Sequence, residues 1–221
     1  MRMRNAWILA LVLTVSACTG NGNELSSGTN GNGATSPVAA VEELRSMLIA
    51  GDFASAAALA VPNQAALASL GEGASFGQVA DAITDGDAEI AANFWSGFGQ
   101  GVGEVLNSEL AIEDRGSTTE SGVEFFLVGV TPEQGTERLI MTRDVDGQRI
   151  DLFASFGAGL AQRMLSPVEI LLGTSSADSA VILDALQDVV PSLLVSATDP
   201  SLSPEAVQGV LQLVELITRV G

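Results

Sequence analysis

The chain has 221 residues, of which 27 are acidic and nine are basic, all of them arginine, and its net charge is −18. This charge repels phosphate groups, which excludes electrostatic binding of nucleic acids and of anionic lipid headgroups. The chain contains no histidine, lysine or tyrosine. These absences exclude Ser-His-Asp and Cys-His catalysis, imidazole zinc sites, Schiff bases and Ser-Lys hydrolases, so only carboxylates remain as acid–base groups.

The first 17 residues have the three parts of a secretory signal peptide. Arg2 and Arg4 give a positive start, the apolar run 6–15 follows, and the small residues Ser16 and Ala17 precede the expected cleavage point. A helix of this length extends about 15 Å, half the hydrocarbon thickness of a bilayer. The run is therefore too short to remain as a membrane span.

The sequence Val15-Ser16-Ala17-Cys18 resembles the lipobox of bacterial lipoproteins, and Cys18 is the only cysteine in the chain. The resemblance implies cleavage after Ala17 and attachment of lipid, with acyl chains such as palmitate, to Cys18. It also implies a domain held outside the cytoplasm, at the cell membrane or the outer membrane. An ordinary secretory peptide with an incidental cysteine is the alternative interpretation.

The segment that follows predicts a tether and then one domain. Residues 19–36 are rich in Gly, Asn, Ser and Thr, and Leu25 is their only aliphatic residue larger than alanine. Such a segment cannot bury enough apolar surface to offset its ordering entropy, so residues 18–36 are expected to be the lipidated cysteine and a flexible tether. Residues 37–221 are long enough for a single globular domain. Loss of Arg2 and Arg4 leaves a net charge of −20, so the acyl chains must supply the membrane contact.

Helical spacing of apolar residues dominates the first part of the domain. Ser36-Pro37 predicts a helix start and Gly51 its end, and Asp52 predicts the cap of the next helix. The predicted helices are 37–50, 53–60, 63–70, 76–83 and a fifth that begins after Asp85 or Asp87, with an apolar stripe at Ile90, Phe94, Phe98, Val102 and Val105.

Four glycines fall inside the fifth helix, at positions 97, 99, 101 and 103. Each costs about 1 kcal/mol relative to alanine in a helix interior, so they need a reason. Close approach of a neighbouring element is the preferred reason, and a break of the helix is the alternative. A phosphate loop is disfavoured because no strand precedes the glycines and no lysine exists.

The middle of the domain changes to the period of strands. The residues around Leu110 and Ile112 predict an edge strand, and 123–130 predicts a central strand because it is apolar on both faces. Segments 137–145 and 148–153 are joined by Asp146-Gly147, a pair favoured in two-residue hairpin turns. Such a turn sets Asp144 opposite Arg149, and Met141 opposite Leu152.

Helical spacing returns after Phe153. One helix carries Phe156, Leu160 and Met164, and Ser166-Pro167-Val168-Glu169 predicts the capping box of a separate short helix that Gly173 ends. Further helices are predicted over 176–190 and from Ser203-Pro204 to Arg219. The last helix is apolar over most of its circumference, which favours burial in the core and leaves a partner or homodimer surface as the alternative.

The predicted fold class is α+β, with N-terminal helices, a four-stranded antiparallel meander and C-terminal helices. Helices before a meander, with the link Ala50-Gly51-Asp52, are similar to the nuclear transport factor and ketosteroid isomerase-like cone superfamily over about residues 37–153. The tyrosine that those isomerases use has no counterpart here, so the resemblance implies no catalytic residue.

Three functions are compatible with this sequence. The first is an envelope lipoprotein that is not an enzyme, needs no cofactor, and binds another envelope protein or a second copy through its C-terminal helices. The second is a carrier of an apolar small molecule lined by Trp95, Phe98 and Phe126, although core packing explains these aromatic residues equally well. The third is a hydrolase with two facing carboxylates.

Two acidic clusters have the oxygen ligands that Ca²⁺ prefers, the first at Asp81, Asp85, Asp87 and Glu89 and the second at Asp144 and Asp146. Neither has the spacing of an EF-hand. The first coincides with a helix start and the second with a turn, so capping and turn roles are favoured over metal binding.

Overall fold

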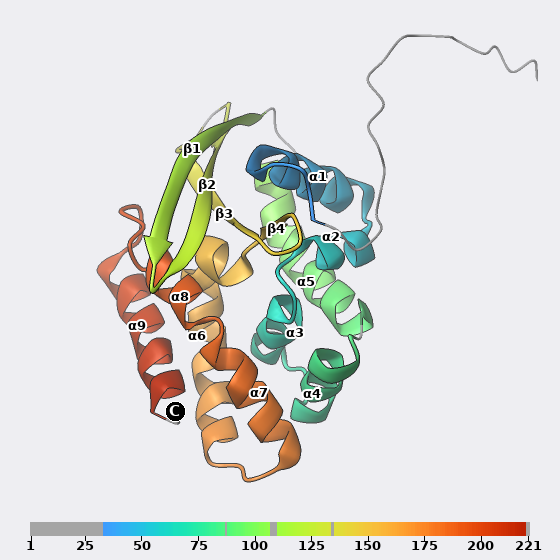
Figure 1. Cartoon of the computed structure of the whole chain (residues 1–221), viewed down its shortest axis with the longest axis vertical. Helices are drawn as coiled ribbons and strands as arrows, with labels where there is room; N and C mark the ends of the chain where they lie inside the picture. The colour runs from blue at the N-terminus through green and yellow to red at the C-terminus, as the bar shows by residue number, and fades with distance from the viewer. Residues whose placement is uncertain (1–32, 87, 107–109, 134, 220–221) are drawn as a thin grey trace, which may run out of the picture.

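The computed structural model describes residues 33–86, 88–106, 110–133 and 135–219. The predicted signal peptide, Cys18 and most of the predicted tether lie outside this part of the chain. The predicted α+β class is confirmed, because helices come first, a four-stranded antiparallel sheet follows, and helices end the chain (Figure 1).

The first helix begins and ends at the residues that its caps predict, and the second begins where its cap predicts, whereas the later N-terminal helices differ from the predicted bounds by a few residues. The Ser36 hydroxyl accepts a hydrogen bond from Ala39 N (3.1 Å), Gly51 ends the first helix with a φ of 71°, and Asp52 caps the second. The elements are α1 (Pro37–Ala50), α2 (Phe53–Leu59), α3 (Gln64–Ala68), the 3₁₀ helix η1 (Ser69–Glu72), α4 (Phe76–Asp85) and α5 (Ala88–Leu106).

The sheet is a meander with the strand order β1-β2-β3-β4. Its strands are β1 (Leu110–Glu120), β2 (Val123–Pro132), β3 (Arg138–Asp144) and β4 (Gln148–Ile150). Figure 1 shows the long β1–β2 hairpin along one side of the molecule, with β4 beside α1 and α2. The main apolar core lies where the N-terminal helices, the sheet and the C-terminal helices meet.

The predicted register of the β3–β4 hairpin is wrong by one residue. Asp144 lies opposite Gln148 and Arg143 opposite Arg149, so the loop has three residues. Asp146 and Gly147 do take positive φ values, 53° and 95°, but Gly147 N donates to the Asp144 carboxylate (3.2 Å). The two arginines diverge, because Arg149 donates to carbonyl oxygens of Val145 and Ala58 while Arg143 reaches Asp151.

The last strand is shorter than predicted because Asp151 caps a helix that begins at Leu152. This helix, α6 (Leu152–Leu172), continues through Pro167, so the predicted capping box at Ser166 is wrong. Proline removes one backbone donor, a loss that packing offsets because Met164, Val168 and Leu171 are fully buried on the same side of the helix.

The remaining helices are α7 (Ala177–Gln187), α8 (Val190–Ser196) and α9 (Pro204–Thr218). The apolar circumference of α9 predicted burial in the core, but the structure buries only one side of this helix. It buries Gly209, Val210, Leu213 and Ile217 along one side and leaves Leu211 48% exposed. The reason is its position, since α9 packs on α6 and α8 at the outside of the molecule (Figure 1).

The helix α5 runs through its four glycines without a break. The expected close approach is wrong at Gly97, because a Cβ atom there would meet only a carboxylate oxygen of Glu72 at 3.9 Å. Asp87, one of its two predicted caps, lies outside the described residues.

The end of the predicted tether is ordered. Ala34 is 6% exposed and forms an antiparallel bridge with Gln148. Gly33 to Ser36 therefore belong to the folded domain together with the predicted residues 37–221.

Within the described part of the chain, no helix by itself has the length and apolarity to cross a bilayer. The pair α7 and α8, bent by 47°, meets that criterion jointly by length and composition alone.

Candidate functional site

The three residues predicted to line a ligand pocket are not brought together as one group. Trp95 and Phe98 lie on α5 with ring centroids 6.0 Å apart. Phe126 lies half-buried on β2 and belongs to neither of the apolar clusters of the domain.

The rings of Trp95 and Phe98 pack against other aromatic side chains. The ring centroid of Phe94 lies 5.5 Å from that of Trp95 and 5.1 Å from that of Phe98. The ring centroid of Phe156, on α6, lies 5.1 Å from that of Phe98 in an edge-to-face arrangement. Trp95 has no exposed surface. The cluster thus joins α5 to α6 as part of the core.

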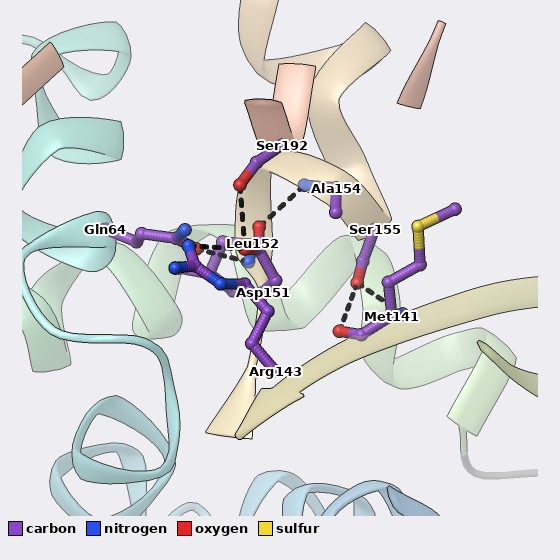
Figure 2. A network of polar contacts seen from close by, with 8 residues as sticks. All are labelled: Gln64, Met141, Arg143, Asp151, Leu152, Ala154, Ser155 and Ser192. Atoms are coloured by element: carbon purple, nitrogen blue, oxygen red, sulfur yellow. Dashed lines mark hydrogen bonds and ion pairs between the residues drawn. The ribbon is translucent and has the colours of Figure 1, made fainter. Parts of the chain in front are cut away.

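A network of buried and half-buried polar side chains surrounds Asp151, between β4 and α6 (Figure 2). One carboxylate oxygen of Asp151 accepts from Ala154 N (2.8 Å), as an N-cap does. The other accepts from the Ser192 hydroxyl of α8 (2.8 Å) and lies 3.5 Å from the Arg143 guanidinium of β3. One side chain therefore ties a strand and two helices together.

Two further hydrogen bonds extend this network to neighbouring elements. The Gln64 side-chain oxygen, from α3, accepts from Leu152 N (2.6 Å), and the Ser155 hydroxyl bonds both Met141 N (2.9 Å) and Met141 O (3.2 Å) of β3 (Figure 2). The start of α6 is thus fixed by residues from both halves of the domain.

The geometry of Asp151 suits a structural role. Asp151 and Ser192 have no exposed surface, and both carboxylate oxygens already accept hydrogen bonds. A carboxylate that acts on a substrate must reach it. Asp151 is held away from solvent, and its partners all belong to the fold.

Two buried donors remain without a hydrogen-bond partner among the described residues, Gln64 Nε2 and Trp95 Nε1. Each costs free energy relative to a satisfied donor. They lie on α3 and α5.

The first acidic cluster does not lie at a single helix start as predicted, because Asp81 lies inside α4, Asp85 is the last residue of α4, and Glu89 lies in the first turn of α5. Asp85 therefore does not cap α5. In the second cluster, Asp144 accepts from Gly147 N in the turn. Among the described residues, no group of three or more carboxylate or thiol side chains could hold a metal ion.

A small groove lies between the ends of α6 and α9 on the described surface. It has a volume of about 170 Å³, and its lining residues are Leu165, Glu169, Gln212, Glu215, Leu216 and Arg219. Arg219 pairs with Glu215 at 2.6 Å. The groove therefore offers two leucines within a mainly polar rim.

Sequence reasoning missed Asp151, the residue on which the network depends. Its signal was an aspartate directly before the apolar segment Leu152-Phe153-Ala154, which is typical of a helix cap. Extending the preceding strand to Phe153 concealed it.

Comparisons with protein-family models, with curated proteins and with solved structures found no match to this chain. The similarity to bacterial lipoproteins at Cys18 and to the cone superfamily therefore stays a prediction from the sequence.

Proposed function

We propose that this chain is a lipid-anchored protein of the bacterial cell envelope, whose acidic domain binds another envelope protein and catalyses no reaction. The anchor rests on the sequence Val15-Ser16-Ala17-Cys18 and on the apolar run before it. The tether then holds the domain away from the membrane surface.

The proposal that the domain is not catalytic rests on the hydrogen bonds of Asp151. In a chain without histidine or lysine, a carboxylate is the natural acid–base group. Asp151 is the one acidic side chain that is fully buried in the described domain, and its hydrogen bonds all go to the fold. Because the fold uses this carboxylate for its own hydrogen bonds, we favour a binding function, which requires only an exposed surface.

The nature of the partner follows from charge. A net charge of −20 after cleavage favours association with a basic surface and disfavours other acidic proteins. Such association weakens as salt screens the charges.

The anchor is tested by detergent-phase partitioning of membranes from the native host. The full chain is expected in the membrane and in the detergent phase, and the Cys18→Ala variant is expected in the aqueous phase. Equal partitioning of the two chains would contradict the anchor.

The binding role is tested by chemical cross-linking in the same cells, followed by purification of the full chain. A partner of basic charge, whose capture falls as the salt concentration rises, is the expected result. Cross-linking that captures no envelope protein at low or high salt would contradict the proposal.

A further inference from the structure

The outer edge of β4 is covered by two segments that come from elsewhere in the chain. At Gln148, the Ala34 backbone pairs in the antiparallel sense, with Ala34 N donating to Gln148 O (2.8 Å) and Gln148 N donating to Ala34 O (2.9 Å). At Ile150, Ala60 pairs in the parallel sense and Val61 N donates to Ile150 O (2.8 Å). Nearly the whole of this short edge is therefore closed.

The N-terminal segment reaches β4 through a contact between two glycines. Gly33 N donates to Asp146 O (2.8 Å). A Cβ atom added to Gly33 would lie 2.6 Å from Gly147 C and 2.7 Å from Gln148 O, closer than real Cβ contacts allow. A Cβ atom added to Gly147 would lie 2.9 Å from Gly33 C in the same way. The two backbones can touch only because neither carries a side chain.

The next residues show how the segment joins the domain. Ala34 is buried and belongs to the main apolar core, whereas Thr35 is exposed and Ser36 caps α1. Gly33 and Ala34 are therefore attached by one methyl group and three backbone hydrogen bonds, whereas Ser36 is held separately as the cap of α1. This is a small attachment beside the core of the domain, and such segments open at lower free energy than the global fold.

We propose that Gly33–Thr35 is a releasable strap, which closes the β4 edge at Gln148 when docked and uncovers it there when it opens. Docked, the strap fixes the point beside the β3–β4 hairpin at which the chain leaves the domain. Released, it returns three residues of the predicted tether to a free state, up to about 10 Å of extended chain. Release also frees the Gln148 backbone for pairing with another strand, while Ala60 and Val61 keep Ile150 covered. The strap does not depend on the lipid anchor or on the identity of a partner.

Residue-level hydrogen exchange of the full chain in detergent micelles tests this proposal. The reporters are the amides of Ala34 and Gln148, which bond each other's carbonyl groups, and the amide of Val61, which belongs to the other half of the β4 edge. In the wild type, both strap reporters are expected to be protected. In the Gly33→Ala variant, they are expected to exchange at least about tenfold faster, with Val61 unchanged.

The matched control is Gly159→Ala, which adds the same methyl group on α6, where a Cβ atom meets nothing within 4 Å. Its exchange pattern is expected to equal that of the wild type. Unprotected strap amides in the wild type, or strap amides in Gly33→Ala that exchange as slowly as in the wild type, would overturn the strap. So would equal loss of protection at Val61, since Gly33 would then support the whole domain.

Discussion

The two edges of the sheet differ in length, burial and closure. The β1 strand has 11 residues, none of them fully buried, and no segment of the described chain pairs with its outer edge. The β4 strand has three residues, all buried, and its outer edge is covered by Ala34 and by Ala60–Val61. Stability in this domain therefore depends on the shorter edge, because that is where distant segments converge.

The open edge has features that limit pairing with other chains. The register shifts between Asp114 and Ser117, and Gly116 in this bulge has a φ of 83°. Arg115 lies 2.7 Å from Glu113 and 2.6 Å from Glu137. A bulge and charged side chains are common protections of exposed edges. These features disfavour pairing of another strand with the uncovered edge of β1.

The largest expected effect is at Asp151, directly after β4. The Asp151→Ala variant leaves the Arg143 charge, the Ser192 hydroxyl and the Ala154 amide without their partner, and should lose about 3–5 kcal/mol of unfolding free energy. Urea unfolding followed by circular dichroism measures this loss. The control is Glu120→Ala at the end of β1, for which a change within about 0.5 kcal/mol is expected. Similar losses in the two variants would remove the distinction between the edges.

A matched isoleucine pair compares the apolar packing of the two edges. Ile150 of β4 has no exposed surface, and Ile112 of β1 is half-buried. Ile150→Ala should lose about 2–5 kcal/mol, and Ile112→Ala should lose about half as much or less. The same unfolding experiment measures both, and an equal or larger loss at Ile112 would contradict the comparison.

The hydrogen bond from Ser192 of α8 to Asp151 is expected to contribute less to the free energy of unfolding. Ser192→Ala removes a single hydroxyl hydrogen bond to the Asp151 carboxylate, which corresponds to about 1.5–3 kcal/mol. In a double-mutant cycle with Asp151→Ala, the loss from Ser192→Ala should nearly vanish. Full additivity of the two losses would mean that Ser192 does not act through Asp151.

The smallest effect concerns Asp52, which caps the helix α2 over β4. Hydrogen bonds from the Ser55 side chain and backbone lower the pKa of the Asp52 carboxyl. A lowered pKa in the folded state adds stability that is present above the unfolded value of about 3.9, and that is lost as the pH falls through the folded pKa. When the pH is lowered from 5 to below about 4, the wild type should therefore lose slightly more unfolding free energy than the Asp52→Asn variant. Parallel pH profiles of the two proteins would contradict this role.

The sequence predicted the elements that depend on local signals. Ser36-Pro37 and Gly51 bound α1 as expected, and the run of apolar residues from Val123 forms an inner strand. These features are set within a few residues of chain, where capping and side-chain periodicity act.

The predictions that were wrong concern features that depend on contacts between segments far apart in the sequence. Asp146-Gly147 by itself favours a two-residue turn, but Gln148 pairs with Ala34, 114 positions earlier in the sequence, and the loop has three residues. The start of α6 has a local signal in its cap Asp151, but its hydrogen bonds to Ser192 and Gln64 come from distant segments, and no local pattern reveals them. Trp95 and Phe98 lie side by side, and their surroundings make them part of the core, which is the alternative that the sequence also allowed.

The most direct test of the lipid-anchored function is the intact mass of the protein purified from membranes of its native host. The predicted result is a chain that begins at Cys18 and carries the additional mass of its acyl groups, with no such species in a Cys18→Ala strain. A chain that retains residues 1–17, or one with an unmodified Cys18, would contradict the lipid anchor and with it the proposed place of this domain at the membrane.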